Sequence, residues 1–191
     1  MGREFELKYR ASASVLGALR EEFGEFTTIE METTYYDTPG KDLSRLRWTL
    51  RRRYENGVSV CTVKTPAHGG GRGEWELPCD DIHTAIAALA DLGAPEDLVQ
   101  LTKGGLEEVC AARFTRLALP LELPGAEAEL ALDEGVLLGG GKLLPFAEVE
   151  VEHKSGSEAL VAAWAAKLAE CYGLEPETKS KVQRALALAA E

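Results

Sequence analysis

Cysteine is scarce in this sequence, and its spacing is irregular. The four cysteines are Cys61, Cys79, Cys110 and Cys171, with no Cys-x-x-Cys pair and no cysteine–histidine pairing of the kind that binds zinc. Structural zinc sites need closely spaced ligands of these two types, so the pattern argues against one. We expect reduced thiols in a cytosolic protein.

Long apolar runs are also missing. No stretch approaches the roughly 20 apolar residues that a membrane-spanning helix needs. The first residues, Met1-Gly2-Arg3-Glu4, are charged at once and offer no signal-peptide core. These observations predict a cytoplasmic protein with no membrane partner.

Positive charge is in deficit. The chain has 21 Lys and Arg against 32 Asp and Glu, which gives a net charge of -11. A nucleic-acid partner is not expected, because phosphate contacts along a nucleic acid need clustered Lys and Arg on a broad surface. A locally basic concave site remains compatible with this charge. A polyanion would then be held by focused cations or through metal ions.

The length and composition predict one folded domain, residues 1–191. The content of 45% hydrophobic and 28% charged residues is ordinary for a globular protein. Only two short glycine-rich pieces occur, 69–71 and 139–141, and both are typical of hairpin loops.

Alternating and helical patterns predict an α+β protein with mostly antiparallel strands. We expect strands at 4–9, 30–37, 48–54, 58–64, 73–78, 113–121, 126–132 and 146–153. We expect helices at 12–23, 82–92, 157–172 and 178–190. Asn56-Gly57 predicts a tight hairpin turn, and Asp133-Glu134-Gly135 predicts a turn after residue 132.

Several of these strands carry charge along one whole face. Side chains at i, i+2 and i+4 point the same way at about 6.6 Å spacing. Glu148, Glu150 and Glu152 share a face opposite Val149 and Val151. Other such sets are Glu4, Glu6 and Lys8; Arg51 and Arg53; Arg72, Glu74 and Glu76; and Glu127, Glu129 and Asp133.

Two interpretations of the charged faces compete. An antiparallel sheet usually turns its polar face to solvent. Three like charges in a row, however, repel one another unless cations lie between them. We therefore expect an eight-stranded antiparallel β-barrel, with helices covering its outside and the charged faces lining a wet lumen. Carboxylates there suit hard divalent cations, and Arg and Lys suit phosphate oxygens.

The ordered set of motifs resembles the CYTH domain family, the triphosphate tunnel metalloenzymes. The stretch Glu4-Phe5-Glu6-Leu7-Lys8 resembles the family's ExExK signature. Later segments follow in the family's order: Tyr35-Tyr36-Asp37-Thr38, Leu50-Arg51-Arg52-Arg53, Thr62-Val63-Lys64, Arg72-Gly73-Glu74-Trp75-Glu76, Glu129 with Asp133-Glu134-Gly135, Glu148 through Glu152, and Ser180-Lys181. The resemblance runs from residue 4 to about residue 184 and implies a triphosphate tunnel with peripheral helices.

The resemblance also implies roles for residues in this chain. The cations expected to bind the triphosphate are Lys8, Arg51, Arg53, Lys64, Arg113 and Lys181. The expected ligands of Mg²⁺ or Mn²⁺ are Glu4, Glu6, Glu74, Glu76, Glu129, Glu148, Glu150 and Glu152. Glu150, Glu152 and Lys8 are expected to act in catalysis. Strand parity allows only one of Arg113 and Arg116 to face inward, and which of them does so is left open.

The implied activity is metal-dependent hydrolysis of a small triphosphate. Inorganic tripolyphosphate, cleaved to pyrophosphate and phosphate, is favoured because aromatic residues that could stack on a base make up only 7% of the chain. Class IV adenylate cyclase and thiamine triphosphatase are the alternatives within the family, and a non-catalytic polyphosphate binder is the alternative outside it. A homodimer is left open.

Overall fold

A computed structural model describes residues 5–66 and 72–190 and contains nine strands and six helices in these ranges. The strands are β1 (Glu6–Arg10), β2 (Thr27–Asp37), β3 (Thr49–Glu55), β4 (Val58–Pro66), β5 (Arg72–Pro78), β6 (Glu107–Leu123), β7 (Ala126–Gly139), β8 (Lys142–Gly156) and β9 (Glu175–Pro176). The helices are α1 (Ala13–Phe23), α2 (Asp42–Arg45), α3 (Ile82–Asp91), α4 (Asp97–Thr102), α5 (Glu158–Tyr172) and α6 (Lys181–Ala190). None of these helices has the length and apolar character to span a bilayer.

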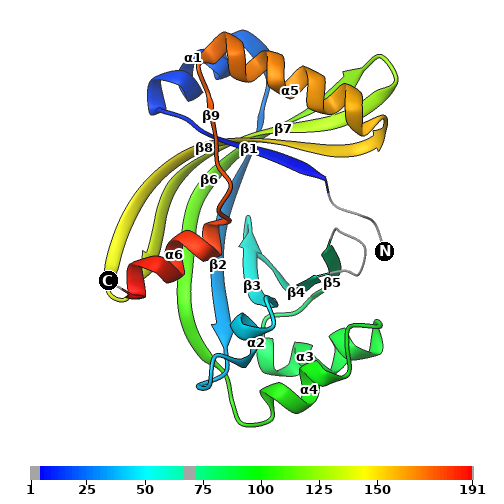
Figure 1. The fold of residues 1–191 in the computed structure, drawn as a ribbon, viewed down its shortest axis with the longest axis vertical. Helices are drawn as coiled ribbons and strands as arrows, with labels where there is room; N and C mark the ends of the chain where they lie inside the picture. Colours follow the sequence, from blue (N-terminus) through cyan, green and yellow to red (C-terminus); the bar gives the residue numbers. More distant parts are fainter. Residues whose placement is uncertain (1–4, 67–71, 191) are drawn as a thin grey trace.

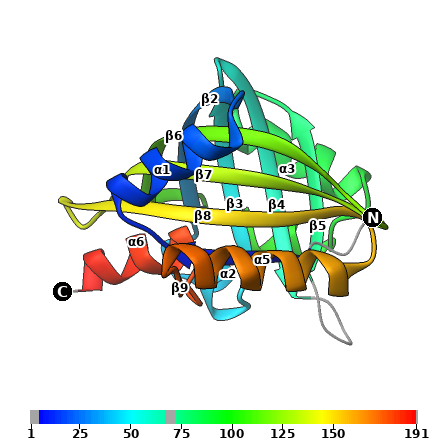
Figure 2. The ribbon, with the colours of Figure 1, turned by 90° about the horizontal axis from the view of Figure 1, so that it is seen from above.

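All nine strands form one antiparallel sheet in the order β5-β4-β3-β2-β6-β7-β8-β1-β9. The sheet curves strongly around a concave face, and β6, β7 and β8 run side by side when seen from above (Figures 1 and 2). The expected tunnel fold with eight long strands is confirmed. Its two edge strands, β5 and β9, are not hydrogen-bonded to each other, so the sheet is curved without being closed by hydrogen bonds.

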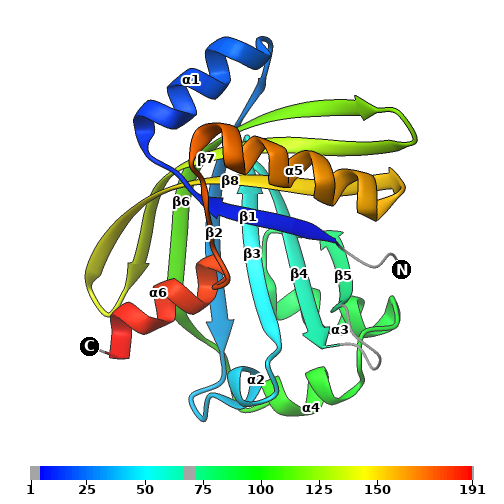
Figure 3. The ribbon, with the colours of Figure 1, turned by 45° about the horizontal axis from the view of Figure 1, so that its top comes forward.

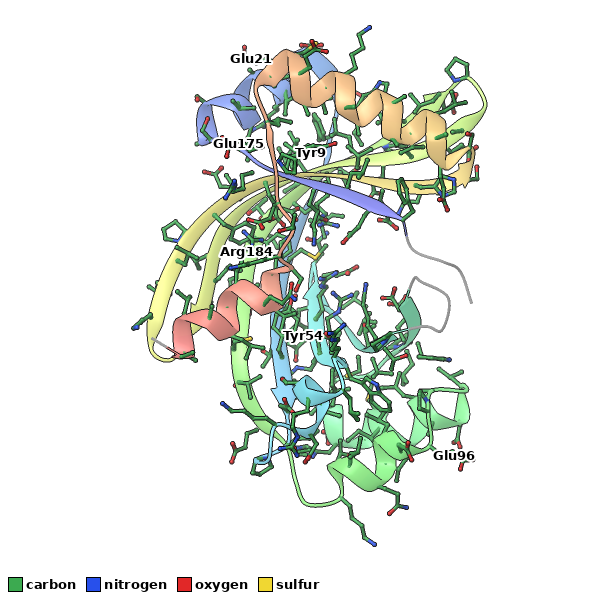
Figure 4. All side chains as sticks on the ribbon, viewed as in Figure 1. Tyr9, Glu21, Tyr54, Glu96, Glu175 and Arg184 are labelled. Carbon is green, nitrogen blue, oxygen red and sulfur yellow. The ribbon has the colours of Figure 1, made fainter. Side chains whose placement is uncertain are left out.

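Two apolar cores lie on the convex side, as the strand parity predicts. Val149 and Val151, which alternate with the glutamates of β8, are fully buried in a core that includes residues of α1 and α5. Tyr9 of β1 belongs to the same core and lies between the sheet and these helices (Figure 4). The second core joins β3 and β4 to α3 and α4. These four helices therefore cover the outside of the sheet.

Helix α6 differs from the others because it packs on the concave side. Its Ala185 is fully buried in a third core with Phe114 of β6 and Phe146 of β8. Helix α6 lies against β6, β7 and β8, and Figure 3 shows it beside β6. The helix starts at Lys181 rather than near 178 because Ser180 and Gln183 cap it reciprocally: Gln183 N–H donates to Ser180 Oγ, and Ser180 N–H donates to Gln183 Oε1.

The turn expected at Asp133-Glu134-Gly135 is wrong, because β7 continues unbroken to Gly139. Gly135 is needed there for close strand packing. A Cβ at this position would lie 2.1 Å from the carbonyl oxygen of Arg113 on β6. Phe114 and Phe146 lie opposite Gly135 in the two neighbouring strands. Their rings pack edge to face, with the ring centres 5.7 Å apart.

The two glycine-rich pieces differ in what can be described. The chain reverses at Gly140 and Gly141, both at positive φ, so the hairpin expected at 139–141 is confirmed. The hairpin expected at 69–71 lies outside the described residues. Asn56 and Gly57, with φ of 50° and 83°, form the predicted tight turn between β3 and β4.

We predict that Gly135→Ala destabilises the protein, since a methyl group would collide with backbone atoms that cannot move aside. The free energy of unfolding should fall by about 2–3 kcal/mol, which corresponds to a melting temperature lower by roughly 4–12 °C. Gly17→Ala in α1 is the control, because nothing lies within 4 Å of its added Cβ. The free energy of unfolding of that variant should rise by about 0.5–1 kcal/mol. Equal melting temperatures for the two variants would contradict the close packing at Gly135.

Candidate active site

The concave face of the sheet holds a cavity of about 440 Å³ with a mostly charged wall. Seven cations among the described residues line it: Lys8, Arg51, Arg53, Lys64, Arg116, Lys154 and Lys181. Seven carboxylates line it as well: Glu6, Glu55, Glu74, Glu76, Glu129, Glu150 and Glu152. The wall is therefore balanced in charge although the chain carries -11. A third of the 21 Lys and Arg are gathered at this one place.

Each of the eight longer strands contributes to this wall, and the strand register places opposite charges side by side. Lys8 of β1 lies opposite Glu150 of β8, and Lys64 of β4 lies opposite Glu74 of β5. Lys64 Nζ is 3.2 Å from Glu74 Oε1. Such cross-strand pairs stabilise neighbouring strands modestly. They also keep cations and carboxylates interleaved along the cavity.

Lys181, at the start of α6, is held in a buried ionic network. Its Nζ donates to Asp133 Oδ2 at 2.8 Å, to Glu150 Oε1 at 2.9 Å and to Glu148. Arg116 donates to both oxygens of Asp133 at 2.7 Å and to Glu150 Oε2 at 2.5 Å. The network balances three carboxylates with cations from β6 and α6, which a buried cluster of charges requires.

The network determines the protonation state of Glu150. Burial by itself would raise the pKa of Glu150, but the charges of Lys181 and then Arg116 outweigh burial and hold that pKa well below its usual range. Burial lowers the pKa of Lys181, whereas the facing carboxylates, Glu150 first, raise it above its ordinary value. Both groups are therefore charged at neutral pH.

Two arginines of β3 are less well compensated. Arg53 donates from Nε to Thr33 Oγ1 at 3.0 Å, and its Nη1 is 3.6 Å from Glu55. Burial and then the nearby charge of Arg51 lower the pKa of Arg53 to about 10. Arg51 has a buried Nε without a hydrogen-bond partner and a long 3.7 Å ion contact with Glu74. A bound anion would relieve both residues.

Most residues expected at the site do lie together in the cavity wall. Those that line it are Lys8, Arg51, Arg53, Lys64 and Lys181 among the expected phosphate ligands, and Glu6, Glu74, Glu76, Glu129, Glu150 and Glu152 among the expected metal ligands. Glu4 lies outside the described residues. Proximity supports a shared site and leaves the role of each residue to experiment.

Two expected residues lie elsewhere. Arg113 is exposed and absent from the cavity wall, and Arg116 lines the cavity instead, because a strand reverses its face at odd steps. The placement of Arg113 at the site is therefore wrong. Glu148 is fully buried behind the wall and bonded to Lys181 and Arg184, so its expected role as a metal ligand is not supported by its position.

Arg52 points away from the cavity, as its parity predicts, yet it is only partly exposed. Its Nη1 donates to the carbonyl of Asp80 at 3.0 Å, and its guanidinium lies 5.2 Å from the ring centre of Tyr54. Arg52 thus links β3 to the segment that precedes α3. A substitution there would affect stability rather than the cavity.

Sequence reasoning missed three charged residues. Lys154 lines the cavity and pairs with Glu152 at 2.8 Å. Asp133 lies on the same strand face as Glu129, and this shared face could have identified it as a site residue. The turn expected at residues 133–135 placed Asp133 outside the strand instead. Arg184 bonds Glu148 from the first turns of α6, near the concave sheet (Figure 4). Nothing in its local pattern distinguishes it from a solvated helix residue.

The donor chemistry of the wall suits a hard divalent cation. Among the described lining residues its candidate ligands are all carboxylates, with no His or Cys. The tightest acidic group among the described residues, Asp133, Glu148 and Glu150, has ligand atoms within 4.8 Å of one another. Lys181 Nζ already bonds all three, so the carboxylates of the wall that remain as candidate ligands outside this group are Glu6, Glu74, Glu76, Glu129 and Glu152.

Two solved structures with this fold align with nearly the whole of this chain. A candidate adenylate cyclase from Bacillus halodurans aligns with a TM-score of 0.69 and 21% identity, over 96% of this chain and 98% of that one. A candidate adenylyl cyclase from Hippeastrum, described as having a dominant triphosphatase activity, aligns with a TM-score of 0.69 and 19% identity, over 96% and 95% of the two chains. These similarities concern the fold alone.

Comparison of the amino-acid sequence gives a relative of higher identity and a match to a family. An inorganic triphosphatase from Haemophilus influenzae is 30% identical over 166 residues. The aligned part is 82% of this chain and 47% of that protein, so the chain spans about half the length of this relative. The model of the CYTH domain matches residues 2–186. With nearly every residue covered, and with the charged cavity on the concave side of its sheet, this chain belongs to the CYTH domain family.

Proposed function

We propose that this protein hydrolyses a linear triphosphate, namely inorganic tripolyphosphate, to pyrophosphate and phosphate within the cavity and with Mg²⁺ or Mn²⁺. The observation that carries the proposal is the wall itself, in which seven cations and seven carboxylates surround about 440 Å³. Cations alone would suit a simple anion receptor. Carboxylates among them suit an anion that arrives with metal ions.

The phosphate oxygens would be bound by Lys8, Arg51, Arg53, Lys64 and Arg116. Arg51 and Arg53 carry the strongest argument, because their charges are buried with long or few anionic contacts. Guanidinium groups bind phosphate oxygens through charge-assisted and often bidentate hydrogen bonds. Groups held in place in this way also stabilise the charge that shifts among the phosphate oxygens in the transition state.

A divalent ion would be held by carboxylates such as Glu6, Glu76, Glu129 and Glu152. When bound, it would neutralise phosphate charge and lower the pKa of a water molecule. The charges of Lys181 and Arg116 hold the pKa of Glu150 well below its usual range, so Glu150 would be a weak base, and we assign acceptance of the proton from the attacking water to Glu152 instead. Water adds to a terminal phosphorus, and the bond from that phosphorus to the bridging oxygen breaks. Lys8 can offset the charge on the departing pyrophosphate.

The lining residues favour an inorganic substrate over a nucleotide. Within the described part of the wall Tyr35 is the one aromatic residue, and a base would gain little from stacking there. The similarity to the Haemophilus influenzae inorganic triphosphatase supports the same choice, although only about half of that relative is covered. Cyclisation of ATP would need a further pocket for adenine and ribose.

A substrate panel tests the proposal. Purified protein with Mg²⁺ or Mn²⁺ should release phosphate from tripolyphosphate with a kcat/KM at least about tenfold above that for ATP or thiamine triphosphate, a gap of roughly 1.4 kcal/mol in transition-state binding. Product analysis should find pyrophosphate and phosphate in equal amounts. Cyclic AMP from ATP as the main product would replace this proposal by the cyclase.

Metal removal should abolish turnover. We expect no phosphate release in EDTA and full recovery with excess Mg²⁺ or Mn²⁺. Glu6→Gln should raise the half-saturating Mn²⁺ concentration about 10-fold or more, because it removes a charged oxygen ligand. Glu127→Gln is the control, since Glu127 is exposed, bonded to Ser155 and outside this cavity. Undiminished turnover in chelator would show that no metal takes part.

Variants of the three consecutive arginines of β3 test which side chains face the cavity and which face away from it. Arg51→Ala and Arg53→Ala should each lose about 2–4 kcal/mol of transition-state stabilisation, which is roughly 30- to 1000-fold in kcat/KM. Arg52→Ala should keep kcat/KM within about threefold while lowering the melting temperature, because its contacts are structural. Similar kinetic losses in all three variants would contradict the inward placement of Arg51 and Arg53.

A further inference from the structure

Lys181 lines the cavity, yet its ammonium group has no donor left for a substrate. An ammonium carries three N–H donors. All three are taken by Asp133, Glu148 and Glu150, and the residue is only 8% exposed. A phosphate oxygen could bind Nζ only by displacing a buried carboxylate, which would then lose its own compensation.

The surroundings of Lys181 also hold it in this position. Its Nζ lies 4.9 Å from the ring centre of Phe114 and 5.4 Å from that of Phe146. Favourable cation–π contacts of this kind occur within about 6 Å. The two rings meet over Gly135 of β7, so the ammonium lies against a surface that Phe114 of β6 and Phe146 of β8 form together.

The contact with Lys181 bears directly on groups that face the cavity. The two oxygens of Glu150 are divided between Lys181, which bonds Oε1, and Arg116, which bonds Oε2. Arg116 is itself held by both oxygens of Asp133, and Asp133 bonds Lys181. Lys181 therefore touches both carboxylates that orient Arg116. Its removal would free Glu150 to rotate and Arg116 to follow it.

We propose that Lys181 is a positioning residue, which holds Glu150 and Arg116 in their working orientation, and that it does not bind the triphosphate itself. This inference rests on the proposed function, because it assigns a role within the same cavity. It reverses the expectation from sequence that Lys181 contacts phosphate. A residue that acts through Glu150 loses its effect when Glu150 is altered, whereas a direct phosphate ligand does not.

Binding and turnover separate the two roles. In EDTA, titration calorimetry of Lys181→Met with tripolyphosphate should weaken the Kd by no more than about threefold, because Arg116 keeps its charge and both of its bonds to Asp133. Arg51→Ala, which removes a phosphate ligand outright, should weaken the Kd about 10-fold or more. With metal, Lys181→Met should lower kcat at least about 10-fold. In the Glu150→Gln background the same substitution should change kcat by less than about threefold. A Kd weakened as much as in Arg51→Ala, or fully additive losses, would overturn the proposal.

Arg184→Met controls for simple docking of the helix. Arg184 also ties α6 to Glu148, but it neither lines the cavity nor bonds Glu150. This variant should lower the melting temperature and keep kcat within about threefold of wild type. A loss of kcat as large as that of Lys181→Met would mean that any loosening of α6 is enough, and would overturn the specific role of Lys181.

The wild-type protein provides a test that needs no folded variant. In ¹⁵N-lysine spectra the ammonium of Lys181 should exchange slowly and keep its shift when tripolyphosphate is added in EDTA, because its three partners remain the same carboxylates. A large shift would overturn the proposal. Absence of both binding and phosphate release in wild type would instead refute the proposed function, so the two failures are distinguishable.

Discussion

The structure depends on cations that neutralise a group of carboxylates buried away from water. Asp133, Glu148 and Glu150 lie within reach of one another on the inner face of two neighbouring strands. Buried like charges at such separations are strongly unfavourable unless cations lie among them. Lys181 and Arg184 from α6, together with Arg116 from β6, supply those cations. The charge of the sheet thus requires the last helix to return to its concave side.

This requirement explains how the apolar cores are distributed. Strands with charge on one face and valine or leucine on the other bury only the apolar face against helices. The helix pairs α1 with α5 and α3 with α4 therefore pack on the convex side. Helix α6 alone has an apolar stripe for the inner face, where Phe114 and Phe146 meet it. The remaining inner surface is the mostly charged wall of the cavity.

Opposite charges neutralise one another more completely in one part of the cavity than in another. This difference bears on where a polyanion would bind. Around Lys181 the ammonium and the carboxylates that it bonds have close partners of opposite charge. Around Arg51 and Arg53 the anionic contacts are long, and the pKa of Arg53 is lowered to about 10. A polyanion has most to gain at the second region. The proposed triphosphatase activity uses this division.

The sequence by itself determined the parity of the strands, and hence that Arg51 and Arg53 share a face and that the valines of β8 oppose its glutamates. Parity is a local property of an extended backbone, so no tertiary information is needed. Only the tertiary structure decided the register between strands and the position of α6. It placed Arg116 inward in place of Arg113, used Gly135 for strand contact instead of a turn, and brought Lys181 and Arg184 onto Glu148. These outcomes depend on contacts between residues far apart in the chain, which no local pattern encodes.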